Sequence, residues 1–213
     1  DQNGHIIYAD RQLMLYAIDI LKRNPGAQII YDVKCSRHLD NLIESHGGQP
    51  LMWKTGHSLV KSKLKETGAL IAGEMSGHIF FKERWYGFDD ALYVAARLVQ
   101  LLSRTEKTLS ELKAILPKYY STPEMRMACE SDEEKFRIAK AAEEYFIANY
   151  ECSTVDGVRI KFGDGWGLVR SSNTQPVIVC RFEASTQERM EEIKELVLNK
   201  LSTIGKLEIE VGH

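Results

Sequence analysis

The sequence contains no apolar run near the ~20 residues that a membrane-spanning helix requires, and no block of basic residues typical of nucleic-acid binding. Lysine and arginine together number 28, against 30 aspartate and glutamate residues, so the formal net charge is −2. Internal repeats and low-complexity segments are also absent. These absences predict a protein of ordinary globular domains, with neither a membrane nor a nucleic acid as partner.

Cysteine is scarce, with four residues at positions 35, 129, 152 and 180. None of them forms a Cys-x-x-Cys pair or a zinc-finger spacing with histidine, so we expect buried free thiols in a reducing cytoplasm. No signal-peptide pattern opens the chain, and residues 1–4 have the composition of a turn without an initiator methionine. We therefore expect a fragment of a longer protein.

The 213 residues are 44% hydrophobic, which suffices for two domains with substantial cores. In the first part, strand and helix patterns alternate, which predicts a layered α/β/α domain with a mixed sheet. The expected strands cover residues 5–8, 28–33, 50–53 and, as a pair, 70–81; the expected helices cover 11–23, 37–45, 57–67 and a segment starting at 88–90. Asp10 is the expected N-cap of the first helix. The last helix carries apolar residues at helical spacing, namely Leu92, Ala95, Ala96, Val99 and Leu102.

A loop-rich segment at 117–123 predicts a boundary between one domain over 1–118 and another over 119–213. Beyond it we expect a helix over 132–149, then strands over 154–155, 158–162, 167–169 and 177–182. A helix over 186–201 follows a Ser185-x-x-Glu188 capping box, and a strand over 206–211 ends the series. Grouped strands with two helices predict a small α+β domain with an antiparallel sheet.

The most informative segment, residues 73–82, is a polar turn between two apolar stretches. Glu74, Ser76 and His78 alternate along it, so an extended backbone would point all three side chains the same way. A carboxylate and a hydroxyl on one edge suit the vicinal hydroxyls of a sugar, and an imidazole can transfer a proton near neutral pH. The alternative interpretation is the solvated face of a strand.

A second polar turn, within residues 165–176, has the composition of an anion-binding loop. Arg170 offers a forked guanidinium that suits phosphate. Ser172, Asn173 and Thr174 add side-chain donors, and a tight turn exposes backbone N–H groups. The alternative is an ordinary Ser/Asn turn with a solvated arginine.

Arg170-x-Ser172-Asn173-Thr174-x-Pro176 resembles the phosphate-binding loop of the α-D-phosphohexomutase superfamily, and residues 73–78 resemble its sugar-binding loop. Residues 31–37 and 53–58 resemble two further signature segments in the expected order. Met75 is more similar to the bacterial phosphomannomutase/phosphoglucomutase branch than to glucosamine mutases, which typically have Gln there. The resemblance covers essentially the whole chain.

The resemblance implies a four-domain enzyme of which this chain is domains three and four. The phosphoserine that transfers the phosphoryl group and the loop that binds Mg²⁺ belong to the first two domains, and neither motif occurs here. No metal site is therefore expected in this chain, and the missing N-terminal domains are expected partners. The family's third domain is α/β, and its fourth is a TATA-binding-protein-like α+β fold.

The resemblance also implies roles for single residues. Glu74 and Ser76 match residues that bind the 3- and 4-hydroxyls of the sugar, and His78 matches a proposed proton carrier. Other matches are Lys34 beside the reacting hydroxyl, Arg11 and His57 along the cleft, and Arg170, Ser172, Asn173 and Thr174 around the non-reacting phosphate. Lys34 could instead be a surface residue, and Arg11 could be solvated at a helix start.

The implied activity is the interconversion of hexose 1-phosphates and 6-phosphates, of mannose and glucose, through a 1,6-bisphosphate. The fragment would bind substrate and be inactive alone. The alternatives are a phosphoglucosamine mutase and a non-catalytic sugar-phosphate-binding module.

Two further kinds of segment have a structural interpretation. For the aromatic run of Trp85, Tyr86 and Phe88 we favour core or interdomain packing over stacking on a sugar. We interpret the charged residues 106–107 and 132–135 as solvated helix ends.

Overall fold

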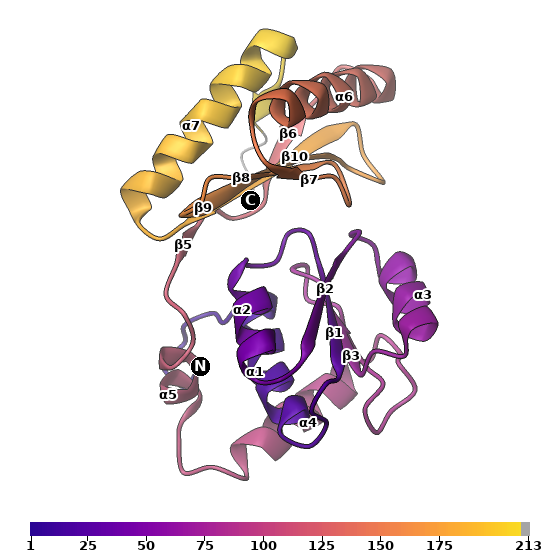
Figure 1. Cartoon of the computed structure of the whole chain (residues 1–213), viewed down its shortest axis with the longest axis vertical. Helices are drawn as coiled ribbons and strands as arrows, with labels where there is room; N and C mark the ends of the chain where they lie inside the picture. Colours follow the sequence, from indigo (N-terminus) through magenta and orange to yellow (C-terminus); the bar gives the residue numbers. More distant parts are fainter. Residues whose placement is uncertain (210–213) are drawn as a thin grey trace. The chain divides into compact units, whose positions relative to one another are not determined.

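The structure, a computed structural model, describes residues 1–209 (Figure 1). Backbone contacts divide the chain into two compact units, Asp1–Pro117 and Lys118–His213. The first unit is a layered α/β fold with a mixed sheet, and the second is an α+β fold with an antiparallel sheet. The predicted fold class is therefore confirmed.

The sheet of the first unit has the strand order β2-β1-β3-β4. Strand β1 (Gln28–Asp32) pairs in parallel with β2 (Gln49–Trp53) and β3 (Ile71–Gly73), while β4 (Ile79–Phe81) runs antiparallel to β3. The carboxyl ends of the three parallel strands consequently lie at one edge of the sheet. In open α/β sheets this is the edge where ligands bind.

Helices α1 (Ala9–Leu21) and α3 (His57–Thr67) lie on opposite faces of this sheet (Figure 1). On one face Val60 and Leu64 of α3 pack against Ile30 and Phe80. On the other face the Tyr16 ring of α1 meets Phe81 with 5.1 Å between ring centroids. The remaining helices of this unit are α2 (His38–Ser45), α4 (Ala91–Leu102) and α5 (Leu109–Ala114).

The second unit has one antiparallel sheet of seven strands, in the order β11-β6-β10-β9-β8-β7 with β5 pairing β10. Helices α6 (Asp132–Asn149) and α7 (Gln187–Ile204) cover one face of it (Figure 1). The core between them includes Ile138, Phe146, Val197, Ile178 and Phe182. The strands are β5 (Tyr120–Ser121), β6 (Met125–Ala128), β7 (Cys152–Ser153), β8 (Val158–Lys161), β9 (Gly165–Ser171), β10 (Val177–Ala184) and β11 (Glu208–Ile209).

Several predicted elements differ from the structure. Residues 5–8 form no strand, and α1 begins at Ala9 with Tyr8 as its N-cap, because the Asp10 carboxylate is engaged with the backbone N–H groups of Arg11 and Ser36. Thr186, not Ser185, caps α7 by accepting a hydrogen bond from the Arg189 backbone. The strand expected at 154–155 lies at 152–153, and α5, β5 and β6 were not predicted. Of the strand expected over 206–211, residues 210–211 lie outside the described part.

The apolar face predicted for α4 is not buried. Leu92 is 85% exposed and Val99 is 66% exposed, and Ala95 and Ala96 between them are exposed too. The buried residue of α4 is Arg97, whose guanidinium lies 4.5 Å from the Phe81 ring centroid and whose Nη1 lies 2.7 Å from Glu83 Oε2. An ion pair over an aromatic ring thus occupies the inner side of this helix.

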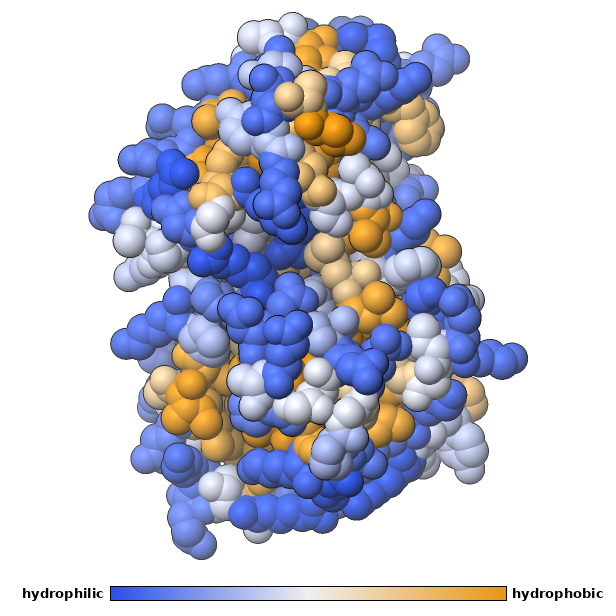
Figure 2. All heavy atoms as spheres, in the orientation of Figure 1, coloured by the Kyte–Doolittle hydropathy of each residue, from blue (hydrophilic) through white to orange (hydrophobic). Residues whose placement is uncertain are grey.

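Within residues 1–209, no helix combines the length and the apolar character that crossing a bilayer demands. The face of the molecule shown in Figure 2 is mostly hydrophilic, with apolar side chains in small separate patches. All four cysteines are free. Cys35 and Cys180 are buried as expected, whereas Cys129 and Cys152 are only partly buried, which corrects the prediction for that pair.

The exposed face of α4 leads to a stability prediction. We expect the double substitution Leu92→Gln/Val99→Gln to change the free energy of unfolding of this chain by no more than ~0.5 kcal/mol per site, because exposed side chains contribute little. Leu13→Ala should cost ~2–5 kcal/mol, since Leu13 is buried in contact with Gly73. Urea denaturation measures both. A large loss from the double substitution would show that this face is covered in solution.

Candidate functional site

The Asp32 carboxylate joins the three loops that follow the parallel strands. It is fully buried at the carboxyl end of β1. Its Oδ1 accepts a hydrogen bond from the Met75 backbone N–H at 3.1 Å, and its Oδ2 accepts one from Thr55 Oγ1 at 3.0 Å. Lys34 Nζ lies 3.8 Å from Oδ2. One carboxylate therefore holds together the loops after β1, β2 and β3, where most of the expected sugar-site residues lie. Asp32 was not predicted as a site residue; an acidic residue ending a buried strand was the available signal.

The segment between β3 and β4 is a tight turn and not the extended edge that the sequence pattern suggested. The Glu74 backbone N–H donates to the His78 carbonyl at 2.8 Å, and Gly77, with a φ of +105°, donates to the Glu74 carbonyl at 3.0 Å. The turn still places Ser76 Oγ 3.4 Å from Glu74 Oε2. His78 is within coulombic range of Glu74 but has Asp89 as its ion-pair partner.

Glu74 is the buried acceptor of this edge. Its side chain belongs to a residue only 3% exposed, and its Oε1 has no hydrogen-bond partner among the described residues. Burial raises the pKa of Glu74, and the negative charge of Asp32 raises it further, while His78, Lys34 and the Gly56 amide act in the opposite direction. A buried carboxylate oxygen without a donor is suited to accept a hydrogen bond from a ligand hydroxyl.

His78 is oriented by a carboxylate. Its Nδ1 lies 2.7 Å from Asp89 Oδ2, and an isolated antiparallel bridge between Phe80 and Asp89 sets the two segments side by side. Asp90 is occupied elsewhere, as the N-cap of α4. With Nδ1 held in this way, Nε2 is the nitrogen left to act on a ligand. His57, the first residue of α3, lies near, with 5.9 Å between the two imidazole centroids.

Lys34 and Arg11 lie near the loop that follows β1. Lys34 is buried, which excludes the interpretation as a solvated surface lysine. Asp10 accepts hydrogen bonds from the backbone N–H of Arg11 at 2.8 Å and from that of Ser36 at 3.2 Å, so the start of α1 is tied to this loop. Arg11 is partly buried at that junction.

In the second unit, Arg170 is held by the turn that precedes β8. Its Nε donates to Asp156 Oδ2 at 3.0 Å, and its Nη2 is buried without a hydrogen-bond partner among residues 1–209. Gly157, at φ +70°, packs so closely that a Cβ there would lie 2.6 Å from the Arg170 Cβ. The Asp156–Gly157 turn thus fixes the guanidinium, and one of its donors remains available for an anion. Asp156 was not predicted to have this role.

The loop after β9 carries the other residues expected at the phosphate. Ser172 is buried, its backbone N–H donates to the Val177 carbonyl at 3.0 Å, and its Oγ accepts from the Thr174 backbone at 3.3 Å. Asn173 and Thr174 are exposed. The structure therefore brings Arg170, Ser172, Asn173 and Thr174 to the same end of β9. In the part of the chain that is described, no three or more His, Cys, Asp or Glu side chains group to hold a metal ion.

Two protein families match the chain. Phosphoglucomutase/phosphomannomutase, alpha/beta/alpha domain III, matches residues 2–120, and the phosphoglucomutase/phosphomannomutase C-terminal domain matches residues 124–200. A phosphomannomutase/phosphoglucomutase of Pseudomonas putida is 55% identical over 201 residues, which are 93% of this chain and 43% of that protein. A phosphoglucomutase of Neisseria meningitidis is 52% identical over 195 residues, covering 91% and 42%.

A solved structure of a phosphoglucomutase/phosphomannomutase family protein from Burkholderia thailandensis superposes with a TM-score of 0.86 at 49% identity. The match covers 96% of this chain and 44% of that one. The chain thus spans less than half the length of the curated relatives that it matches.

The raised pKa of Glu74 leads to a prediction on stability. A carboxyl group whose pKa is higher in the folded state stabilises the fold below its unfolded pKa, and that contribution is lost as the pH rises through the folded value. We therefore expect Glu74→Gln to raise the Tm at pH 7, by roughly 2–4 °C per kcal/mol gained. The gain should shrink toward zero near pH ~4, where the native carboxyl is protonated.

Calorimetry across this pH range measures the effect. Glu134→Gln is the matched control, because its partner Arg137 lowers the pKa of Glu134 and the expected change has the opposite sign. A Tm for Glu74→Gln that is unchanged or lowered at pH 7 would contradict the prediction.

Proposed function

The chain belongs to the phosphoglucomutase/phosphomannomutase family, and on this premise we propose that it is the C-terminal part of an enzyme that interconverts hexose 1-phosphates and 6-phosphates. The observation that carries the proposal is the buried Glu74 carboxylate beside Ser76 Oγ, with an oxygen that has no donor in the described chain. Sugar hydroxyls would supply that donor. In this assignment residues 1–118 bind the sugar and residues 119–213 bind phosphate.

Glu74 and Ser76 would bind the 3- and 4-hydroxyls of the substrate. Glucose and mannose present these two hydroxyls identically and differ only at carbon 2. A pair of contacts restricted to carbons 3 and 4 therefore accepts both sugars. It also accepts a sugar that has turned end over end, provided that the two hydroxyls exchange places.

Proton transfer would be the task of His78. The free 1- or 6-hydroxyl of the sugar would attack the phosphorus of a phosphoserine outside this chain. As the new P–O bond forms and the P–O bond to serine breaks, the hydroxyl proton would pass to His78 Nε2, and the serine oxygen would leave as an alkoxide that takes up a proton from solvent. Asp89 holds the imidazole by Nδ1 and stabilises the imidazolium that forms. Lys34 adds positive charge next to Glu74 and Asp32, and His57 and Arg11 would line the same edge. The product is a 1,6-bisphosphate, which returns its other phosphoryl group to the serine.

Arg170, Ser172, Asn173 and Thr174 would bind the phosphate that is not reacting. The buried Nη2 of Arg170 supplies a charged donor, and the fixed loop supplies direction.

Magnesium, held by residues outside this chain, would neutralise charge on the transferring phosphoryl group. We place the enzyme in the cytoplasm, where hexose phosphates and reduced thiols coexist. Met75 favours this branch over a phosphoglucosamine mutase.

The first test compares the chain with its full-length protein. We expect the 213-residue chain to convert no mannose 1-phosphate above contaminant level, because it carries no match to the phosphoserine or to the metal loop. The full-length protein should convert both mannose and glucose 1-phosphates when supplied with Mg²⁺ and a bisphosphate sugar. A coupled assay measures both. A full-length protein without mutase activity would favour the non-catalytic binding module, and turnover by the chain alone would refute the domain assignment.

A second test concerns the proposed binding of phosphate by Arg170. Arg170→Ala in the full-length enzyme should raise KM for both the 1-phosphate and the 6-phosphate, because each has a non-reacting phosphate in one orientation. The loss of a charged hydrogen bond corresponds to ~1.5–3 kcal/mol. Arg170→Lys should recover only part of it, since an ammonium lacks the guanidinium fork. Arg137→Ala on the exposed side of α6 is the control. A normal KM for both phosphosugars in Arg170→Ala would exclude the role.

A further inference from the structure

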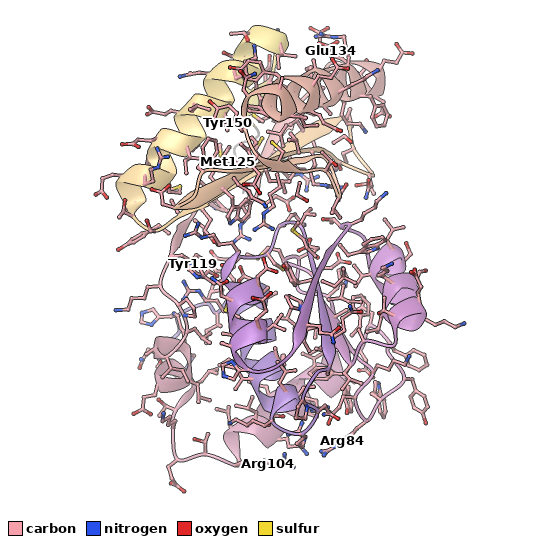
Figure 3. All side chains as sticks on the ribbon, viewed as in Figure 1. Arg84, Arg104, Tyr119, Met125, Glu134 and Tyr150 are labelled. Carbon is pink, nitrogen blue, oxygen red and sulfur yellow. The ribbon has the colours of Figure 1, made fainter. Side chains whose placement is uncertain are left out.

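Lys135 lies in the first turn of α6, a charged helix start for which solvated side chains were expected. Its neighbour Glu134, labelled in Figure 3, meets that expectation by pairing with Arg137 at 2.6 Å on the exposed side of the helix. Lys135 does not, because its side chain is only 4% exposed. A lysine is almost never buried to this extent without partners that compensate its charge.

The ammonium of Lys135 uses all three of its donors. Nζ lies 2.6 Å from Asp132 Oδ1, 3.1 Å from the Ser172 carbonyl oxygen and 3.1 Å from the Gln175 carbonyl oxygen. A lysine has three N–H donors and no acceptor, so these partners satisfy it completely. Two of the three belong to the loop that carries Asn173 and Thr174, whereas Asp132 itself is largely exposed. The loop therefore accounts for the burial of the ammonium.

The Ser172 and Gln175 carbonyl groups lie near the two ends of the loop, so the Lys135 ammonium bonds both ends of it. The rest of the loop is bound to the sheet, by Ser172 N–H on the Val177 carbonyl at 3.0 Å and by Cys129 N–H on the Pro176 carbonyl at 2.9 Å. Carbonyl oxygens directed at Lys135 are directed away from any anion at the loop. The ammonium also offsets their partial negative charge near the expected phosphate.

We propose that Lys135 is a positioning residue for phosphate binding: it holds the Ser172–Gln175 backbone in the conformation that presents Ser172, Asn173 and Thr174, without contacting the substrate. The proposal rests on the mutase function proposed above. It goes beyond that function, because Lys135 lies on helix α6, outside the loop residues that resemble the family's phosphate-binding loop.

The kinetic signature follows from which phosphate the loop holds. A non-reacting phosphate is bound in the ground state and in the transition state alike. An interaction of this uniform kind changes KM and leaves kcat nearly unchanged. A purely structural lysine would instead lower the Tm and leave KM unchanged in enzyme that is still folded.

The experiment uses the full-length enzyme with Lys135→Met, which keeps the chain length but removes the donors, and Lys135→Arg, which keeps the charge. Lys140→Met is the matched control, since Lys140 is exposed on the same helix and lies 4.0 Å from Glu144. Steady-state kinetics with the 1-phosphate and the 6-phosphate are run well below the Tm of each variant. We expect Lys135→Met to raise KM about tenfold for both substrates, with kcat within about threefold of wild type.

Lys135→Arg should fall between wild type and Lys135→Met, and Lys140→Met should match wild type. An unchanged KM in folded Lys135→Met overturns the proposal even where the Tm falls. If Lys135→Met does not fold, Lys135→Arg decides: a raised KM for both substrates supports the positioning role, and a wild-type KM overturns it. A wild-type enzyme without mutase activity would instead refute the proposed function, which separates the two failures.

Discussion

The organisation of the candidate site at the carboxyl ends of β1, β2 and β3 depends on one buried charge, the carboxylate of Asp32. Three loops leave the parallel strands β1, β2 and β3. A backbone hydrogen bond from the Val33 N–H to the Trp53 carbonyl at 3.0 Å joins the first two, and Asp32 ties all three together through the Met75 backbone, the Thr55 hydroxyl and the Lys34 ammonium. Removing one partner of such a buried group leaves an uncompensated charge, which costs ~3–5 kcal/mol. The arrangement of the three loops therefore depends on this carboxylate keeping its partners.

The same carboxylate also acts on Glu74 through space. Burial raises the pKa of Glu74 and the negative charge of Asp32 raises it further, so the group that joins the three loops also opposes the ionisation of the neighbouring carboxyl. Lys34 and His78 counteract this effect. Glu74 Oε1 and Arg170 Nη2 belong to the same pattern, because each is a buried polar atom without a hydrogen-bond partner among residues 1–209. Such atoms destabilise a fold unless a ligand, an ion or a water molecule completes them.

Sequence patterns were sufficient for the elements that follow simple periodicity. Helices over 57–67 and 132–149 have the bounds expected from their flanking residues, and the alternation of strands and helices predicted the layered first unit. Helix α4 shows where periodicity fails. Leu92, Ala95, Ala96 and Val99 share a face as predicted, but the pattern says nothing of which face turns inward. Arg97 is buried because Glu83 and the Phe81 ring compensate it, and these lie on other elements. Short strands such as β5 and β6 left no detectable pattern, since pairing with β10 defines them.

In the candidate site, too, the sequence indicated some of the residues and not others. Residues that would touch a ligand were visible in the sequence, because a carboxylate, an imidazole and a guanidinium in short polar turns indicate chemistry directly. Residues that hold them gave only weak signals in the sequence: Asp32 ends an apolar strand, Asp89 resembles a second helix cap, and Asp156 resembles an ordinary turn residue. Their roles arise from contacts with segments distant in the chain, such as the 2.7 Å approach of Asp89 to His78. Each supporting carboxylate contacts a loop or a side chain that local sequence leaves free to adopt other conformations. The geometry of the candidate site therefore depends on these ionic contacts as well as on the turns that carry its polar groups.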